Sequence, residues 1–94
     1  MANDRIQLQH PTKTAPTIRT ATYNAYRDAI LTAIPRVEQG ITFKDLLTTV
    51  EQIDPTLSDH GSVNWYVTTV KLHLEATGEI ERIPGATPQR IRHA

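Results

Sequence analysis

The sequence predicts a small α+β domain in which a short strand precedes three helices and a C-terminal β-hairpin. Three observations predict it: apolar residues recur at helical spacing in three segments, proline or glycine separates these segments, and residues near the C-terminus alternate on both sides of a Pro/Gly turn. A chain of 94 residues forms one domain at most. We expect that domain over residues 21–94, with a strand and arm over residues 1–20.

The N-terminal segment predicts a strand followed by a loop. Residues 5–10 alternate in polarity, with Ile6 and Leu8 on one side, and Pro11 ends the pattern. Residues 11–20 are rich in proline and threonine and have little to bury, so we expect a loop or arm. The polar start lacks the apolar run of a signal peptide or membrane span, which favours a cytoplasmic protein.

The first helix is expected to begin at Thr20 or Thr22, either of which is a competent N-cap, and to end before Pro35. Gly40 then allows a turn into a one- or two-residue strand at Ile41. The first helix has an apolar stripe at helical spacing, formed by Tyr23, Tyr26, Ile30, Ala33 and Ile34.

The second helix is expected to begin after Thr42, because Thr42 to Asp45 resembles a capping box. It spans about ten residues and ends at Asp54-Pro55. Its apolar face comprises Phe43, Leu46, Leu47 and Val50.

The third helix is expected from Ser62 to Thr77, because Ser62 is in a position to cap its start and Gly78 is a natural C-terminal stop. At 100° per residue its core stripe comprises Val63, Tyr66, Val67, Val70 and Leu74. The far side carries Asn64, Trp65, Thr68, Lys71, Leu72 and Glu75.

The C-terminal segment is expected to form a hairpin around residues 84–88, with Ile80 and Ile91 facing inward. This order of elements resembles the winged helix-turn-helix fold over residues 21–93. The most specific stretch is 70–82, in which Leu74, three further residues and Gly78 precede an apolar-x-Arg run ending at Arg82. Residues 61–71 are also similar to a small family of uncharacterised bacterial winged-helix-like proteins.

The resemblance implies a small DNA-binding or transcription-regulatory protein, because in this fold the third helix lies in the major groove and the hairpin wing contacts the backbone. It also implies a homodimer, the usual state of winged-helix regulators. The implied contacts to duplex DNA are Ser62, Asn64, Thr68 and Lys71 on the helix, with Arg82, Arg90 and Arg92 on the wing. The same residue types also decorate any solvated helix face, and arginines on a hairpin edge discourage edge-to-edge pairing.

The charge distribution opposes strong DNA binding. Lysine and arginine number ten, as do aspartate and glutamate, so the net charge is zero. Residues 41–78, which include the helix-turn-helix, carry two bases, Lys44 and Lys71, against five acids. We therefore expect modest DNA affinity for a monomer.

An alternative function follows from Trp65 and Leu72, which lie seven residues apart and away from the core stripe. Either the N-terminal strand covers them, or they contact a partner protein, for which tryptophan is a typical anchor. In the second case the chain is a winged-helix protein-protein interaction module without DNA binding.

Enzymatic and metal chemistry are not expected. The chain has no cysteine, its four histidines show no paired spacing with acids, and no phosphate-binding glycine loop occurs. We expect no catalytic residues, metal, cofactor, small-molecule substrate or membrane association.

Overall fold

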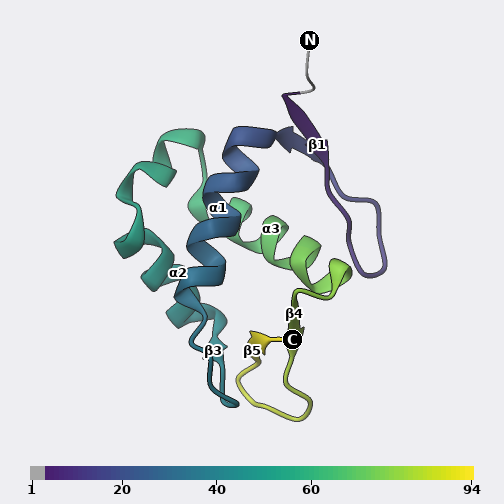
Figure 1. The fold of residues 1–94 in the computed structure, drawn as a ribbon, viewed down its shortest axis with the longest axis vertical. Helices are drawn as coiled ribbons and strands as arrows, with labels where there is room; N and C mark the ends of the chain where they lie inside the picture. Colours follow the sequence, from purple (N-terminus) through teal and green to yellow (C-terminus); the bar gives the residue numbers. More distant parts are fainter. Residues whose placement is uncertain (1–3) are drawn as a thin grey trace.

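The computed structural model describes residues 4–94, and residues 1–3, where the expected N-terminal segment begins, lie outside the described residues. The described chain has the predicted α+β architecture, with four helices and two small antiparallel sheets (Figure 1). None of these helices is long and apolar enough to span a membrane. In chain order the elements are β1 Arg5–Gln7, β2 Thr17–Arg19, α1 Thr20–Ala33, β3 Ile41–Thr42, α2 Phe43–Ile53, the 3-10 helix η1 Pro55–His60, α3 Val63–Thr77, β4 Ile80–Arg82 and β5 Arg90–His93.

Local capping sets the ends of α2 and α3, as predicted. The Thr42 hydroxyl accepts a hydrogen bond from the Asp45 amide at 3.2 Å, and the Ser62 hydroxyl accepts one from the Trp65 amide at 3.2 Å. Gly78 ends α3 in the left-handed conformation, with φ of 83°. The short helix η1 was not predicted; Asp54 caps it by accepting from the Thr56 amide at 3.0 Å.

The prediction that a threonine caps the start of α1 is wrong. Arg19 occupies the N-cap position without a side-chain hydrogen bond. The Thr20 amide instead donates to the backbone oxygen of Asp4 at 2.7 Å, so the preceding hairpin supplies the acceptor. Thr22 lies within the helix, buried, with its hydroxyl 3.1 Å from His60 Nδ1.

The expectation of a loop over residues 11–20 is wrong at its C-terminal end, where β2 pairs antiparallel with β1 and Ile18 lies opposite Ile6. The reason is that Ile18 gives this segment an apolar side chain to bury, and it is only 5% exposed. Leu8 and Ile18 both belong to the hydrophobic core. The N-terminal hairpin, residues 4–20, therefore packs onto the helical part of the chain.

The three long helices surround the core, and the sheet closes one end of it. Sheet order is β3-β5-β4, and the inward positions predicted for Ile80 and Ile91 are confirmed, since both are buried. Gly40 permits the close approach of β5: its φ is +58°, and a Cβ there would lie 1.9 Å from the Ile91 carbonyl oxygen. Fully buried core side chains include Tyr26, Ile30, Leu46, Val50, Val67, Val70 and Leu74.

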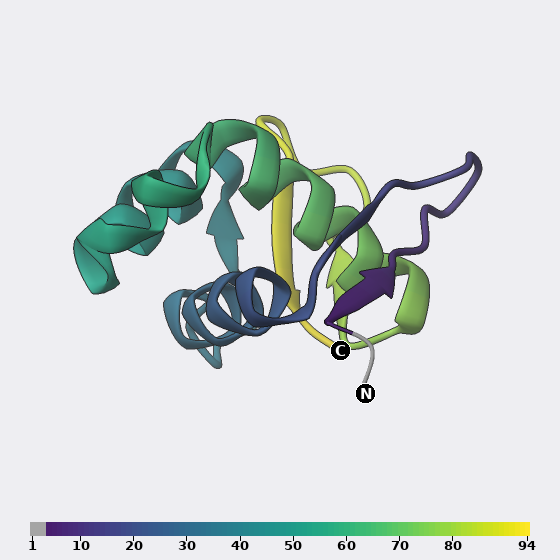
Figure 2. The same cartoon turned by 90° about the horizontal axis from the view of Figure 1, so that it is seen from above.

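Seen from above, the N-terminal half of α3 and the turn between β4 and β5 lie on the side of the molecule away from α1 (Figure 2). The N-terminal hairpin runs alongside the C-terminal half of α3 (Figures 1 and 2). This arrangement leaves the two halves of α3 in different surroundings.

Candidate functional site

The C-terminal half of α3 is covered by the N-terminal hairpin. The backbone amide of Gln9 donates to Nδ1 of His73 at 2.8 Å, and His73 is buried. Further along, residues 10–12 and Leu72 line a common hollow. Surface available to a partner on α3 is therefore concentrated on its first two turns.

His73 fastens the hairpin to the helix. Burial lowers the pKa of His73, an effect that the nearby Glu79 carboxylate opposes. In the neutral ring, Nδ1 can accept a hydrogen bond from the Gln9 amide. The His73 ring also contacts Tyr23 edge-on, with ring centroids 5.2 Å apart. Sequence reasoning missed this role; the available signal was the position of His73 beside Leu74 of the core stripe.

Three of the predicted DNA-contact residues lie at the uncovered end of α3. Ser62 and Asn64 are exposed, and Thr68 is half-buried, with its hydroxyl 3.4 Å from Asn64 Oδ1. Ser62 is also the helix cap. Asn64 and Thr68 therefore lie together, and none of the three side chains carries a charge.

Lys71 does not lie with these side chains, and its expected position on the exposed side of the helix is wrong. It is buried and forms an ion pair with Glu75, one helical turn away. Glu75 also accepts from Nε of Arg82 at 2.5 Å, which ties β4 to α3. The physical reason is that a buried ammonium group requires an opposite charge, and Glu75 supplies it.

The arginines of the β4–β5 hairpin are not assembled as a free cationic patch. Arg82 and Arg92 each contact a carboxylate, and the Arg92 Nε lies 2.6 Å from Glu81 Oε2 across the β4–β5 pair. Arg90 donates to the backbone oxygen of Gln39 at 2.7 Å, and within residues 4–94 it forms no ion pair. Cations expected to contact phosphate thus contact the protein itself.

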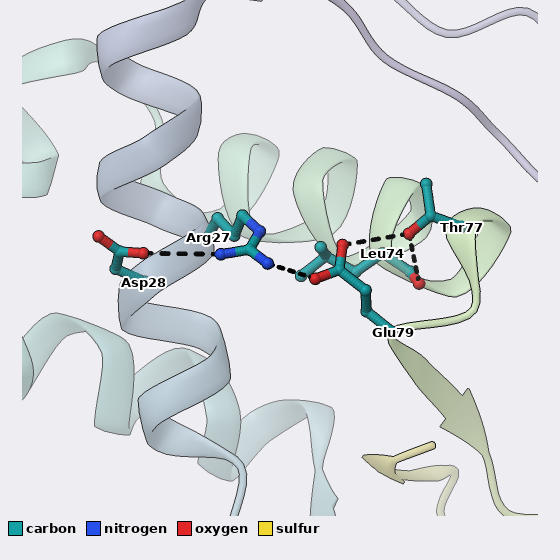
Figure 3. A network of polar contacts seen from close by, with 5 residues as sticks. All are labelled: Arg27, Asp28, Leu74, Thr77 and Glu79. Carbon is teal, nitrogen blue, oxygen red and sulfur yellow. Dashed lines mark hydrogen bonds and ion pairs between the residues drawn. The ribbon is translucent and has the colours of Figure 1, made fainter.

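A further arginine links α1 to the end of α3 (Figure 3). Arg27 contacts Asp28 at 3.9 Å and hydrogen-bonds Glu79, which raises the pKa of the guanidinium. Thr77 donates to the backbone oxygen of Leu74 at 3.2 Å and lies 3.3 Å from Glu79. This network closes the helix end and leaves Arg27 engaged.

Trp65 and Leu72 lie in different environments. Leu72 is half-buried in the covered half of α3, whereas Trp65 is 46% exposed in the uncovered half. The Trp65 ring stands edge-on to Tyr66, with centroids 5.0 Å apart, and Tyr66 stacks on Tyr26 at 5.0 Å. Trp65 and Leu72 therefore do not form one interface, and of the two only Trp65 is exposed to solvent.

Tyr26 anchors this aromatic series in the core. Its hydroxyl donates to the backbone oxygen of Leu57 at 3.0 Å, and burial raises its pKa to about 12. The series Trp65, Tyr66, Tyr26 thus extends from the surface to a fixed hydrogen bond in the interior.

A hollow of about 410 Å³ lies beside Trp65, between the N-terminal hairpin and the start of α3. Arg5 and Arg19 line it and lie directly opposite each other across β1 and β2. Sequence reasoning missed both because the register of the hairpin was not predicted; the apolar Ile6 and Ile18 were the available signal. The other lining residues are Thr17, Ile18, Thr22, Asp59, His60, Trp65 and Tyr66.

No group of three or more histidines and acids within residues 4–94 is placed to hold a metal ion.

The model of a protein family described as a family of unknown function, DUF6958, matches residues 5–91. Neither a curated protein nor a solved structure matches the chain.

Proposed function

Because the chain belongs to the DUF6958 family, whose function is unknown, we propose its function from the surface itself. The chain is a winged-helix interaction module that binds a partner protein through the first two turns of α3. The observation that carries this proposal is Trp65, a large aromatic side chain that is 46% exposed yet backed by the core.

Trp65 has the properties of an interface anchor. Tryptophan is enriched among residues that dominate binding energy at protein interfaces. Its contact with Tyr66, and the stacking of Tyr66 on Tyr26, hold the ring in place before any partner arrives. A side chain already held in position loses less conformational entropy on binding.

The surroundings of Trp65 suit a protein better than a phosphate backbone. Residues 61–70 include no charged side chain, and the centre of a protein interface is typically depleted of charge. Asn64 and Thr68 supply hydrogen-bonding groups next to the ring. Lys71, the cation nearest in sequence on α3, is buried in its ion pair.

Photocrosslinking tests the proposal in cells of the native host. A photoreactive amino acid replaces Asn64, next to the anchor, and in a matched control it replaces Gln52 on the exposed face of α2. We expect a protein adduct from position 64 that Trp65→Ala abolishes, and no such adduct from position 52. Equal adducts from both positions, or an adduct unaffected by Trp65→Ala, would contradict the proposal.

DNA binding is the second candidate, favoured by the placement of the N-terminal half of α3 and the β4–β5 turn on one side of the molecule (Figure 2). The order of helices and hairpin supports the same winged-helix arrangement, in which both elements face duplex DNA. Asn64, Thr68 and Arg90 are then the contacts, since Lys71, Arg82 and Arg92 are engaged with carboxylates.

Mobility shifts of genomic fragments at low and moderate salt test this candidate. DNA binding predicts complexes that weaken with salt and with Arg90→Gln combined with Asn64→Ala. Complexes insensitive to both would rule out this surface. A DNA-binding homodimer also predicts sedimentation above the 10.5 kDa of one chain.

A further inference from the structure

We propose that the hollow beside Trp65 binds an acidic residue of a partner protein, an Asp or Glu followed or preceded by an apolar side chain. Arg5 and Arg19 hold the carboxylate, and Trp65 with Tyr66 forms the apolar wall. The inference rests on the proposed function, because it describes the ligand of the same surface.

Arg5 and Arg19 lie directly opposite each other in the hairpin, so their positive charges repel. The Thr20 amide bonds the oxygen of Asp4, and the Leu8 amide bonds that of Pro16. Hydrogen-bonded and non-hydrogen-bonded pairs alternate along an antiparallel ladder, so Asp4, Ile6 and Leu8 belong to hydrogen-bonded pairs. Arg5 and Arg19 therefore form a non-hydrogen-bonded pair, in which the two side chains lie closer together. Like charges directly opposite each other destabilise a strand pair.

Three other arginines of the described chain are each paired with an acid. Arg27 pairs with Glu79, Arg82 with Glu75 and Arg92 with Glu81. Arg5 and Arg19 form no ion pair within residues 4–94, and both are exposed. An anion between them would remove their repulsion and gain two charge-assisted hydrogen bonds.

The size and charge of the hollow favour a single carboxylate. Asp59 also lines it, so two arginines and one aspartate leave one positive charge. A volume of about 410 Å³ lies in the usual range for small binding pockets. A nucleic-acid backbone would require cations repeated along its length, and residues 61–70 of α3 provide none.

The aromatic side of the hollow determines what accompanies the carboxylate. Trp65 and Tyr66 present ring surface next to the arginines. An aliphatic or aromatic residue beside the acid would cover that surface while the acid contacts Arg5 or Arg19. The partner is therefore a segment with alternating acidic and apolar character.

Selection of random peptides displayed on phage tests the inference with four purified proteins. These are the wild type, Trp65→Ala, the double variant Arg5→Gln/Arg19→Gln, and the control Lys13→Gln/Arg36→Gln, which removes two exposed cations that do not line the hollow. We expect the wild type and the control to enrich peptides with Asp or Glu beside an apolar residue. The double arginine variant should lose the acidic preference but keep the apolar one, and Trp65→Ala should lose the apolar one.

Failure of the inference and failure of the proposed function give different results. If the double arginine variant enriches the same acidic peptides as the wild type, the inference is wrong while the Trp65 surface stands. If Trp65→Ala changes nothing, the proposed function is wrong. Displacement of selected peptides by duplex DNA, together with no acidic enrichment, would assign the arginines to nucleic acid and overturn the inference.

Affinity and stability measurements separate a binding role from a structural one. Each single change, Arg5→Gln or Arg19→Gln, should weaken a selected acidic peptide by roughly fivefold, the usual limit for an exposed charge pair. Both changes should leave the urea midpoint unchanged or raise it, because they remove like-charge repulsion. A lowered midpoint with unchanged peptide affinity would show a structural role and contradict the proposal.

Discussion

The ammonium group of Lys71 forms an ion pair with the carboxylate of Glu75, and the two side chains are only 6% and 7% exposed. The same carboxylate accepts from Arg82 on β4. Glu75 therefore balances two cations and joins α3 to the following strand. This pair removes from the surface the one lysine that the third helix offered for contact with phosphate.

The Lys71–Glu75 pair predicts a large cost when one charge is removed. Glu75→Gln leaves Lys71 buried without its counter-charge, so we expect the free energy of unfolding to fall by about 3–5 kcal/mol. Urea denaturation followed by circular dichroism measures the loss. The double variant Lys71→Met/Glu75→Leu should recover most of it, and a double variant as unstable as Glu75→Gln would contradict this account of the pair.

The contact between Gln9 and His73 predicts a dependence of stability on pH. Burial lowers the pKa of His73 in the folded chain, while the unfolded chain takes up the proton near the ordinary value of about 6.5. Stability is therefore fully present above that pH and falls as the pH is lowered through the folded pKa. Urea midpoints between neutral and mildly acidic pH measure the fall.

His73→Asn is the matched control for this pH dependence, because its carbonyl can still accept from the Gln9 amide but does not titrate. We expect the urea midpoint of this variant to fall less than that of the wild type as the pH is lowered. An unchanged decline in this variant would assign the titration to another group.

Tyr26 predicts an effect at alkaline pH. Burial raises its pKa to about 12, whereas the unfolded side chain ionises near 10. Stability should therefore fall as the pH rises above about 10, because the unfolded chain then loses a proton that the folded chain retains. Spectroscopic titration of tyrosinate should show a late phase that is smaller in Tyr26→Phe, because burial also raises the pKa of Tyr23. This variant should also lose about 1–2 kcal/mol through the unpaired Leu57 carbonyl.

Replacing either of two glycines with positive φ by alanine is expected to lower the stability, but by different amounts. At Gly40 a Cβ would meet the Ile91 carbonyl oxygen at 1.9 Å, whereas at Gly85 it would meet nothing within 4 Å. Gly40→Ala should cost roughly 3 kcal/mol or more through clash and backbone strain, and Gly85→Ala about 1 kcal/mol through strain alone. Similar unfolding free energies for the two variants would show that β5 does not depend on the close approach of Gly40.

Elements set by neighbouring residues could be predicted from the sequence. The caps Thr42 and Ser62, the stop at Gly78 and the inward positions of Ile80 and Ile91 depend on local chemistry or on a simple period, and all five are confirmed. Strand β2 could not be predicted, because its formation depends on Ile18 pairing with Ile6 twelve residues earlier.

The site was less predictable, since its chemistry depends on contacts distant in sequence. Helical spacing placed Lys71 on the far side of α3 but gave no information on its burial or on the contact of Glu75 with Arg82. The neighbourhood of Arg5 and Arg19 likewise required the register of the hairpin. The sequence left the exposure of Trp65 as one of two alternatives, because it does not reveal that the hairpin covers the other half of α3.

The central claim, that Trp65 is the anchor of a protein-binding surface, is tested most directly by its own fluorescence, because it is the only tryptophan in the chain. The emission and its quenching by acrylamide are measured on the monomer, alone and saturated with a selected peptide that lacks tryptophan. We predict a red-shifted, readily quenched emission that shifts to the blue and becomes protected on binding. An emission already blue-shifted and protected in the free monomer, or one that binding leaves unchanged, would contradict the claim.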